Sequence, residues 1–215
     1  MKFYLISPPK KNIFFRPDNI EIMSEILPFS FFQFRPKHKT LRNRIKFVDS
    51  YYEKISEICK KKKIKMIINN DFEIAEKFDF DGIPLGQTDK SCHDAKRKFG
   101  EKFIVGVSCS DSMQLYKKAE EQNADYVAFG PVFNTTSKNK NKINLNKLSL
   151  SLKNLRLPFT LIGGINHNNF MTLTKLKPNN LATINAFWNY PSGPIRSAIR
   201  FRQILKDISL YENEC

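Results

Sequence analysis

The sequence is poor in the residues that covalent catalysis and transition-metal binding need. It has 3 histidines in 215 residues, and none of them has a catalytic or ligating partner at a telling spacing. The 4 cysteines lie far apart and form no C-x-x-C pair, so the pattern indicates neither a zinc site nor a disulfide framework. They are Cys59, Cys92, Cys109 and Cys215.

Long apolar runs are also missing. No stretch of 18 apolar residues occurs, and the apolar segment at the N-terminus, Phe3 to Ile6, is too short for a signal peptide. We therefore expect a soluble cytosolic protein that does not enter a membrane.

Acidic residues are outnumbered, with 21 Asp and Glu against 36 Lys and Arg, and the formal net charge is +15. This charge suits a nucleic-acid-binding protein or an enzyme for polyanionic small molecules. The lysine runs at 60–65 and 138–142 are of a kind that more often forms solvated faces. No RNA- or DNA-binding motif accompanies them, so the charge alone does not identify the ligand. The loops that follow the apolar runs are more informative.

Strand-like apolar runs alternate with segments of helical periodicity, such as 41–59 and 110–122. This alternation predicts a parallel sheet with right-handed crossovers. Eight runs in a chain of this length predict one α/β domain over residues 1–215, a (β/α)8 TIM barrel whose active site lies at the C-terminal ends of the strands; an open doubly wound sheet is the alternative. The runs are 3–6, 29–34, 64–68, 82–85, 103–107, 126–129, 159–162 and 181–186.

The second to fifth runs end in residues suited to a diphosphate and a metal. Extended chain after the second run puts Gln33, Arg35 and Lys37 on one side, where a guanidinium fork and a mobile ammonium would bind an anion. The third run ends in Asn69-Asn70-Asp71 and the fourth in Asp89, and oxygens from these two ends could bind one Mg²⁺. Either Asp could instead cap the helix that follows it. Ser108 adds a hydroxyl at the end of the fifth run.

The last three runs predict a second anion site. The loop after the sixth run is rich in small donors and ends in a lysine, and the seventh run ends in two glycines that let backbone amides approach a ligand. A helix starting near Asn168 would direct its N-terminus there. With the end of the eighth run, these residues predict a phosphate site. They are Thr135, Thr136, Ser137, Lys138, Gly163, Gly164, Ile184 and Asn185.

Five motifs in this order resemble the thiamine-phosphate synthase family of TIM barrels. They are Gln-x-Arg-x-Lys at 33–37, Asp-Gly-Ile-x-Leu-Gly-Gln-x-Asp at 81–89, Gly-Val-Ser at 106–108, the run from Asp125 to Lys138, and Gly-Gly-Ile at 163–165. The resemblance implies a cytoplasmic transferase that uses Mg²⁺. It would condense hydroxymethylpyrimidine diphosphate with hydroxyethylthiazole phosphate to give thiamine phosphate and pyrophosphate.

The resemblance also implies a role for each matching residue. Arg35, Lys37 and Lys138 would be catalytic, stabilising the departing pyrophosphate, and Asn70 with Asp89 would hold the metal. Small molecules are the implied partners, without nucleic acid or membrane, and a homo-oligomer is compatible with them. The implied pyrimidine diphosphate ligands are Gln33, Arg35, Lys37, Asn69, Ser108 and Lys138, and the thiazole phosphate ligands are Thr135, Ser137, Gly164, Ile184 and Asn185.

Several positions depart from the family's pattern. Asn-Asp-Arg is usual where this chain has Asn69-Asn70-Asp71, so a metal-binding carboxylate is replaced by Asn70, or Asp71 takes its role after a one-residue shift. Where the family usually has a histidine, this chain has Pro84. It has Asn134 in place of a usual proline and Asn185 in place of a usual serine. These departures keep a non-catalytic homologue as an alternative. The related thiazole tautomerase is disfavoured because its histidine is replaced by Ser110.

Overall fold

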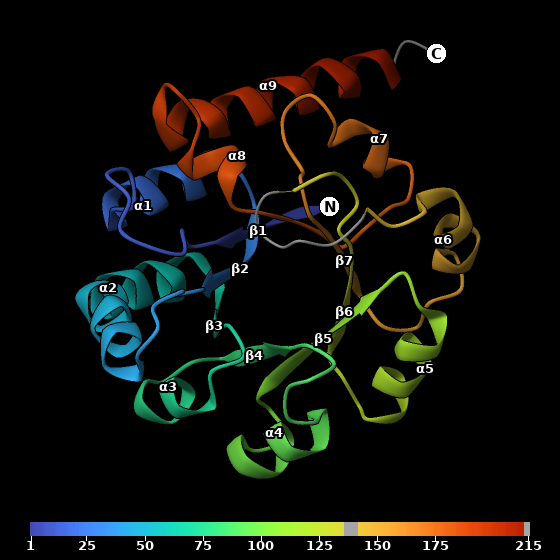
Figure 1. The fold of residues 1–215 in the computed structure, drawn as a ribbon. Coiled ribbons are helices and arrows are strands. Elements are labelled where there is room, and N and C mark those ends of the chain that lie inside the picture. The colour runs from blue at the N-terminus through green and yellow to red at the C-terminus, as the bar shows by residue number, and fades with distance from the viewer. Residues whose placement is uncertain (136–141, 213–215) are drawn as a thin grey trace.

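Eight parallel strands form a closed barrel in the order of the sequence, β1-β2-β3-β4-β5-β6-β7-β8 (Figure 1). Lys2 of β1 pairs with Asn180 of β8, which closes the ring and rules out the open doubly wound sheet. The computed structural model describes residues 1–135 and 142–212. The strands are Lys2–Ile6, Phe29–Phe34, Lys65–Ile68, Gly82–Leu85, Ile104–Ser110, Tyr126–Phe129, Phe159–Ile162 and Asn180–Thr183.

The helices form an outer ring around this barrel (Figure 1). The helix after β8 is a single turn, α8, and the long α9 follows it and packs beside α1 and α8. The protein is therefore a (β/α)8 TIM barrel. The helices are α1 Pro17–Ile26, α2 Leu41–Lys62, α3 Phe72–Lys77, α4 Cys92–Phe99, α5 Met113–Glu121, α6 Leu145–Leu152, α7 Met171–Thr174, α8 Asn185–Trp188 and α9 Gly193–Glu212.

Side chains of the strands alternate between two separate apolar clusters. The larger cluster lies between the barrel and the helices and includes Phe3, Leu5 and Phe32. The smaller cluster fills the inside of the barrel; its buried members are Tyr4, Ile6, Ile67, Tyr126 and Ala182. A buried strand residue thus faces either the helices or the interior, and the interior residues carry the site.

Two local predictions needed correction. The eighth strand ends at Thr183 and not at 186, because the chain turns at Ile184 and continues as α8. The helical segment expected from residue 110 begins at Met113 as α5, because the Ser112 hydroxyl caps the helix there by accepting a hydrogen bond from the Leu115 amide. Both differences lie at element ends, where periodicity carries the least information.

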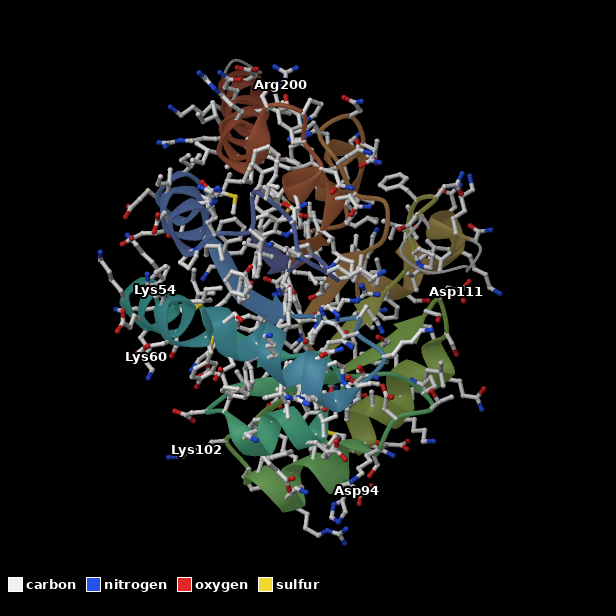
Figure 2. The ribbon with its side chains drawn as sticks, turned by 60° about the vertical axis from the view of Figure 1, so that its left-hand side comes forward. Lys54, Lys60, Asp94, Lys102, Asp111 and Arg200 are labelled. Atoms are coloured by element: carbon white, nitrogen blue, oxygen red, sulfur yellow. The ribbon has the colours of Figure 1, made fainter. Side chains whose placement is uncertain are left out.

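Much of the positive charge lies on the outside of the helices. Lys54 and Lys60 on α2, and Arg200 on α9, are exposed and point away from the barrel (Figure 2). This placement agrees with the interpretation of the lysine run at 60–65 as a solvated face. In the part of the chain that the structure describes, no helix has the length and apolar character needed to span a bilayer.

Candidate active site

A cavity of about 520 Å³ opens at the C-terminal ends of the strands. Its volume is in the range of small-molecule sites, and its place is where barrels of this fold carry their active sites. Every predicted site residue that the structure describes lines it, and Thr136, Ser137 and Lys138 lie outside the described residues. The lining includes Gln33, Arg35, Lys37, Asn69, Asn70, Asp89, Ser108, Thr135, Gly164, Ile184 and Asn185.

Pairing between β1 and β2 continues past the strands and aims two cations into the cavity. The Ser7 amide donates to Gln33 O at 2.8 Å, the Arg35 amide to Ser7 Oγ at 2.9 Å, and the Lys37 amide to Pro9 O at 2.8 Å. Because the chain stays extended, Gln33, Arg35 and Lys37 alternate onto the same side, as the sequence predicted.

These two cations lie in an environment that disfavours positive charge. Arg35 is 7% exposed, and burial lowers the pKa of its guanidinium. Partial burial, and next the nearby charge of Arg35, lower the pKa of the Lys37 ammonium, which lies nearer the rim. Among the described residues, no carboxylate forms an ion pair with either group. Lys37 is exposed and near the charge of Asp89, whereas the buried Arg35 lacks a counter-charge, which indicates an anionic ligand.

Asn70 and Asp89 lie together after β3 and β4, on the side of the cavity next to β2 and the cations that follow it. Asn70 Nδ2 donates to Asp89 Oδ1 at 2.9 Å, and Asp89 Oδ2 accepts from the Gly86 amide at 2.6 Å. Asn70 has a φ of 38°, a left-handed conformation that asparagine tolerates better than most residues. These two hydrogen bonds, from the Asn70 side chain and from the Gly86 backbone, therefore fix the orientation of the Asp89 carboxylate.

Asp71 is engaged elsewhere. Its carboxylate caps α3, accepting from the Ile74 amide at 3.3 Å, and pairs with Arg44 Nε of α2 at 2.7 Å. Asp71 does not line the cavity. The helix-capping role, which the sequence left open for this residue, is the one it has in the structure.

The loop after β6 is joined to the loop after β7 by backbone hydrogen bonds. The Val132 amide donates to Ile162 O and the Phe133 amide to Gly163 O, each at 3.0 Å. Gly164 has a φ of +67°, and a Cβ there would lie 2.3 Å from Asn134 O. Only glycine permits this approach, which brings Thr135 and Gly164 to one side of the cavity.

The helix expected near Asn168 starts later and is short. A turn occupies 167–170, stabilised by the hydrogen bond from the Asn168 amide to Asn166 Oδ1 at 2.9 Å, and α7 begins at Met171 and ends at Thr174. A single turn carries little dipole, so the prediction of a helix N-terminus at the glycines is wrong. The backbone of Gly164 remains as the feature of this loop that approaches the cavity.

The sequence reasoning missed three residues beneath the site. Ser7, directly after the first apolar run, is fully buried, and its hydroxyl oxygen accepts a hydrogen bond from the Arg35 amide. Tyr4 and Tyr126 belong to two of the strand-like apolar runs and are both 3% exposed, yet their hydroxyls lie 3.0 Å apart and Tyr4 also donates to Gln33. A buried tyrosine hydroxyl nearly always has a partner, which was the available signal.

Comparison with known proteins supports one family for this chain. The family model described as thiamine monophosphate synthase matches residues 3–187. A thiamine-phosphate synthase of Pelagibacter ubique is 37% identical over 198 residues, covering 92% of this chain and 93% of that protein. One of Nitrosococcus oceani is 33% identical over 170 residues, covering 79% and 76%.

Solved structures agree on the fold. A thiamine phosphate pyrophosphorylase from Pyrococcus furiosus matches with a TM-score of 0.77 at 22% identity, covering 96% of both chains. A 3-hexulose-6-phosphate synthase from Salmonella typhimurium matches with a TM-score of 0.66 at 16% identity, covering 96% and 99%. At these identities the structural likeness concerns the barrel alone.

Proposed function

The chain belongs to the thiamine monophosphate synthase family, and from this membership and the geometry of its cavity we propose that it is a thiamine-phosphate synthase. Its substrates are 4-amino-2-methyl-5-hydroxymethylpyrimidine diphosphate and hydroxyethylthiazole phosphate. Its products are thiamine phosphate and pyrophosphate. The protein is accordingly a transferase that acts on small molecules.

The observation that carries this proposal is the buried Arg35 beside Lys37. A guanidinium that is 7% exposed and has no carboxylate partner among the described residues needs an anion to offset its loss of hydration. A diphosphate supplies that charge and matches the planar fork of arginine. The pyrimidine diphosphate is therefore assigned to the side of the cavity formed by β2 to β5, with Gln33, Asn69 and Ser108 as further ligands.

The opposite side of the cavity is assigned to the thiazole phosphate. Thr135 offers a hydroxyl, and the close approach at Gly164 brings backbone amides to the wall. Ile184 and Asn185 follow β8 on the same side. Ser137 belongs to this set and Lys138 to the diphosphate set by the family's sequence pattern alone.

The residues present fit a magnesium ion that arrives with its substrate. Mg²⁺ in such sites is commonly held by one or two carboxylates together with substrate phosphates and water. Asp89 provides one carboxylate, and Asn70 could add the second lone pair of its Oδ1, which accepts from Asn69, while its Nδ2 continues to donate to Asp89. In the part of the chain that the structure describes, no cluster of three His, Cys, Asp or Glu offers a more complete cage. We assign the metal to Asn70 and Asp89, since Asp71 is occupied by Ile74 and Arg44.

The proposed reaction is a dissociative substitution. The bond between the pyrimidine methylene carbon and the diphosphate oxygen breaks first, its electron pair leaves with pyrophosphate, and the thiazole nitrogen then forms the new carbon–nitrogen bond. Arg35, Lys37 and Lys138 stabilise the charge on the leaving group. Magnesium, when bound, supplies further positive charge at the same place. No step needs a general base, which agrees with the lack of any His, Cys or Ser triad in the predicted site.

Mixing the purified protein with both substrates and Mg²⁺ tests the proposal. We expect thiamine phosphate and pyrophosphate to form in equal amounts, measured by chromatography and a coupled pyrophosphate assay. Binding of both substrates without product would contradict the activity and identify a barrel that kept its anion sites and lost its chemistry.

Asn70→Asp is expected to strengthen magnesium binding. Two unit charges about 4 Å apart interact by about 4 kcal/mol at an effective dielectric constant near 20, and much of this is offset by repulsion from Asp89, so we expect an increase of about tenfold. Without metal the variant should melt at a lower temperature, because Asp89 loses the amide donor at 2.9 Å and gains a like charge. Titrating Mg²⁺ while following the melting temperature measures both effects.

Asp71→Asn is the matched control for this experiment. It removes a carboxylate one residue away, where asparagine can still cap α3, and it breaks the ion pair with Arg44. We expect a lower melting temperature and an unchanged response to Mg²⁺. Magnesium dependence that is unchanged in Asn70→Asp and altered in Asp71→Asn would move the metal to Asp71.

A further inference from the structure

A chain of side-chain hydrogen bonds crosses the floor of the cavity. Tyr126 and Tyr4 join through their hydroxyls at 3.0 Å, and Tyr4 donates to Gln33 Oε1 at 2.7 Å. Gln33 Nε2 donates to Asn69 Oδ1 at 2.7 Å, and Asn69 Nδ2 donates to Asn70 Oδ1. We call this series, which ends with Asn70 donating to Asp89, the floor relay.

The carboxylate at one end fixes the direction of the floor relay. A carboxylate accepts and does not donate, so Asn70 must present Nδ2 to Asp89 and therefore its Oδ1 to Asn69. By the same reasoning, Asn69 presents its Nδ2 to Asn70 and its Oδ1 to Gln33. Gln33 then donates through Nε2, and its Oε1 must face Tyr4. Tyr4 thus donates its single hydroxyl hydrogen to Gln33, so Tyr126 is the donor in the hydrogen bond between the two tyrosines.

The two tyrosines are held rigidly in this arrangement. Their rings both pack on Phe31, with centroids 5.1 Å from it. Gly106 leaves room for the Tyr126 ring, since a Cβ there would lie 2.1 Å from its Cζ. Burial is the main cause that raises the pKa of both hydroxyls, so each keeps the proton that the floor relay requires.

We propose that Tyr4 is a positioning residue for the pyrimidine diphosphate, acting by holding the Gln33 amide in the one orientation that the floor relay allows. An amide can be reversed with little change in shape, which exchanges a donor for an acceptor at the cavity wall. Gln33 is 4% exposed and lines the cavity, so the choice between its two orientations determines what a ligand meets there. Tyr126 supports Tyr4 from behind and does not contact Gln33 in the relay.

The inference rests on the proposed function, and calorimetric titration of Tyr4→Phe tests it. The variant leaves Gln33 Oε1 without its donor and frees the amide to reverse. We expect the dissociation constant for pyrimidine diphosphate with Mg²⁺, measured without the second substrate, to rise about tenfold. The dissociation constant for thiazole phosphate should stay the same. In turnover, KM for the pyrimidine diphosphate should rise by a similar factor, with a smaller change in kcat.

Two further variants separate positioning from a general loss of structure. Tyr116→Phe removes another buried hydroxyl, one that contacts Glu120 and the Arg156 amide far from the cavity, and should change neither dissociation constant. In a Gln33→Leu background, Tyr4→Phe should cause no further loss of affinity, since the amide that it orients is gone.

The outcomes distinguish the inference from the function. A wild-type protein that does not bind pyrimidine diphosphate would overturn the proposed function. Wild-type binding that Tyr4→Phe leaves intact, or a loss of affinity that is equal for both substrates, would overturn the positioning role. An additive loss in the Gln33→Leu background would overturn it as well.

Discussion

Arg35→Ala is expected to reduce kcat/KM by about 10²- to 10³-fold, the range found when one preorganised group that stabilises developing charge is removed. The guanidinium is buried at the cavity wall and lacks a carboxylate partner in the described residues, and the neighbouring Lys37 lacks the planar fork that binds two phosphate oxygens at once. Steady-state kinetics measure the fall in kcat/KM, and inhibition by pyrophosphate measures the lost affinity for the leaving group. The inhibition constant for pyrophosphate should rise.

The stability of this variant should move in the opposite direction. A buried cation without a counterion costs free energy in the ligand-free protein, so Arg35→Ala should melt at the same or a higher temperature than the wild type. Arg35→Lys keeps the charge and loses the fork, and should have an intermediate rate. Arg97→Ala on α4 removes a largely exposed arginine and should leave turnover unchanged. Wild-type rates in Arg35→Ala would refute the assignment of the diphosphate.

Gly164→Ala should raise KM for thiazole phosphate by about 10²-fold, the size of effect that a displacement of about 1 Å in a site can cause. The added Cβ would meet Asn134 O at 2.3 Å and Phe133 Cβ at 2.8 Å, so the loop after β6 must move away from Gly164. The affinity for pyrimidine diphosphate should change far less, because its assigned ligands follow other strands. Titration with each substrate separately measures the difference.

Gly100→Ala is the matched control. Gly100 has a φ of +93°, so alanine is strained there too, but nothing lies within 4 Å of the added Cβ. It ends α4, on the outer ring. We expect a fall of a few degrees in melting temperature and no change in either affinity. Equal effects of Gly100→Ala and Gly164→Ala on thiazole phosphate would mean that backbone strain, and not the contact with the neighbouring loop, matters.

The sequence predicted the barrel because its apolar runs and helical segments alternate along the whole length. The alternation rule also placed Gln33, Arg35 and Lys37 on one side correctly, since extended pairing with the segment after β1 continues through that stretch. Those predictions depend on backbone periodicity, which is local. The ends of short elements, such as α7 at Met171, depend on turn hydrogen bonds that periodicity does not report.

The contacts between strands could not be read in the same way. Whether Tyr4 reaches Gln33 and Tyr126 depends on the stagger of strands around the closed barrel, and no pattern within one strand specifies it. The choice between Asn70 and Asp71 was equally open, because both follow β3 directly. The ion pair of Asp71 with Arg44, on which our assignment of the metal to Asn70 rests, involves a residue of α2 that no pattern near β3 reports.

The separation of the two apolar clusters has a consequence for changing the enzyme by design. Ile6, Ile162 and Ala182 belong to or pack against the interior cluster and line the cavity, whereas the larger cluster under the helices contains none of them. A library limited to these three positions would vary the volume available to a substrate ring while leaving the layer between barrel and helices intact. Substrate range and thermal tolerance should therefore be adjustable separately in this protein.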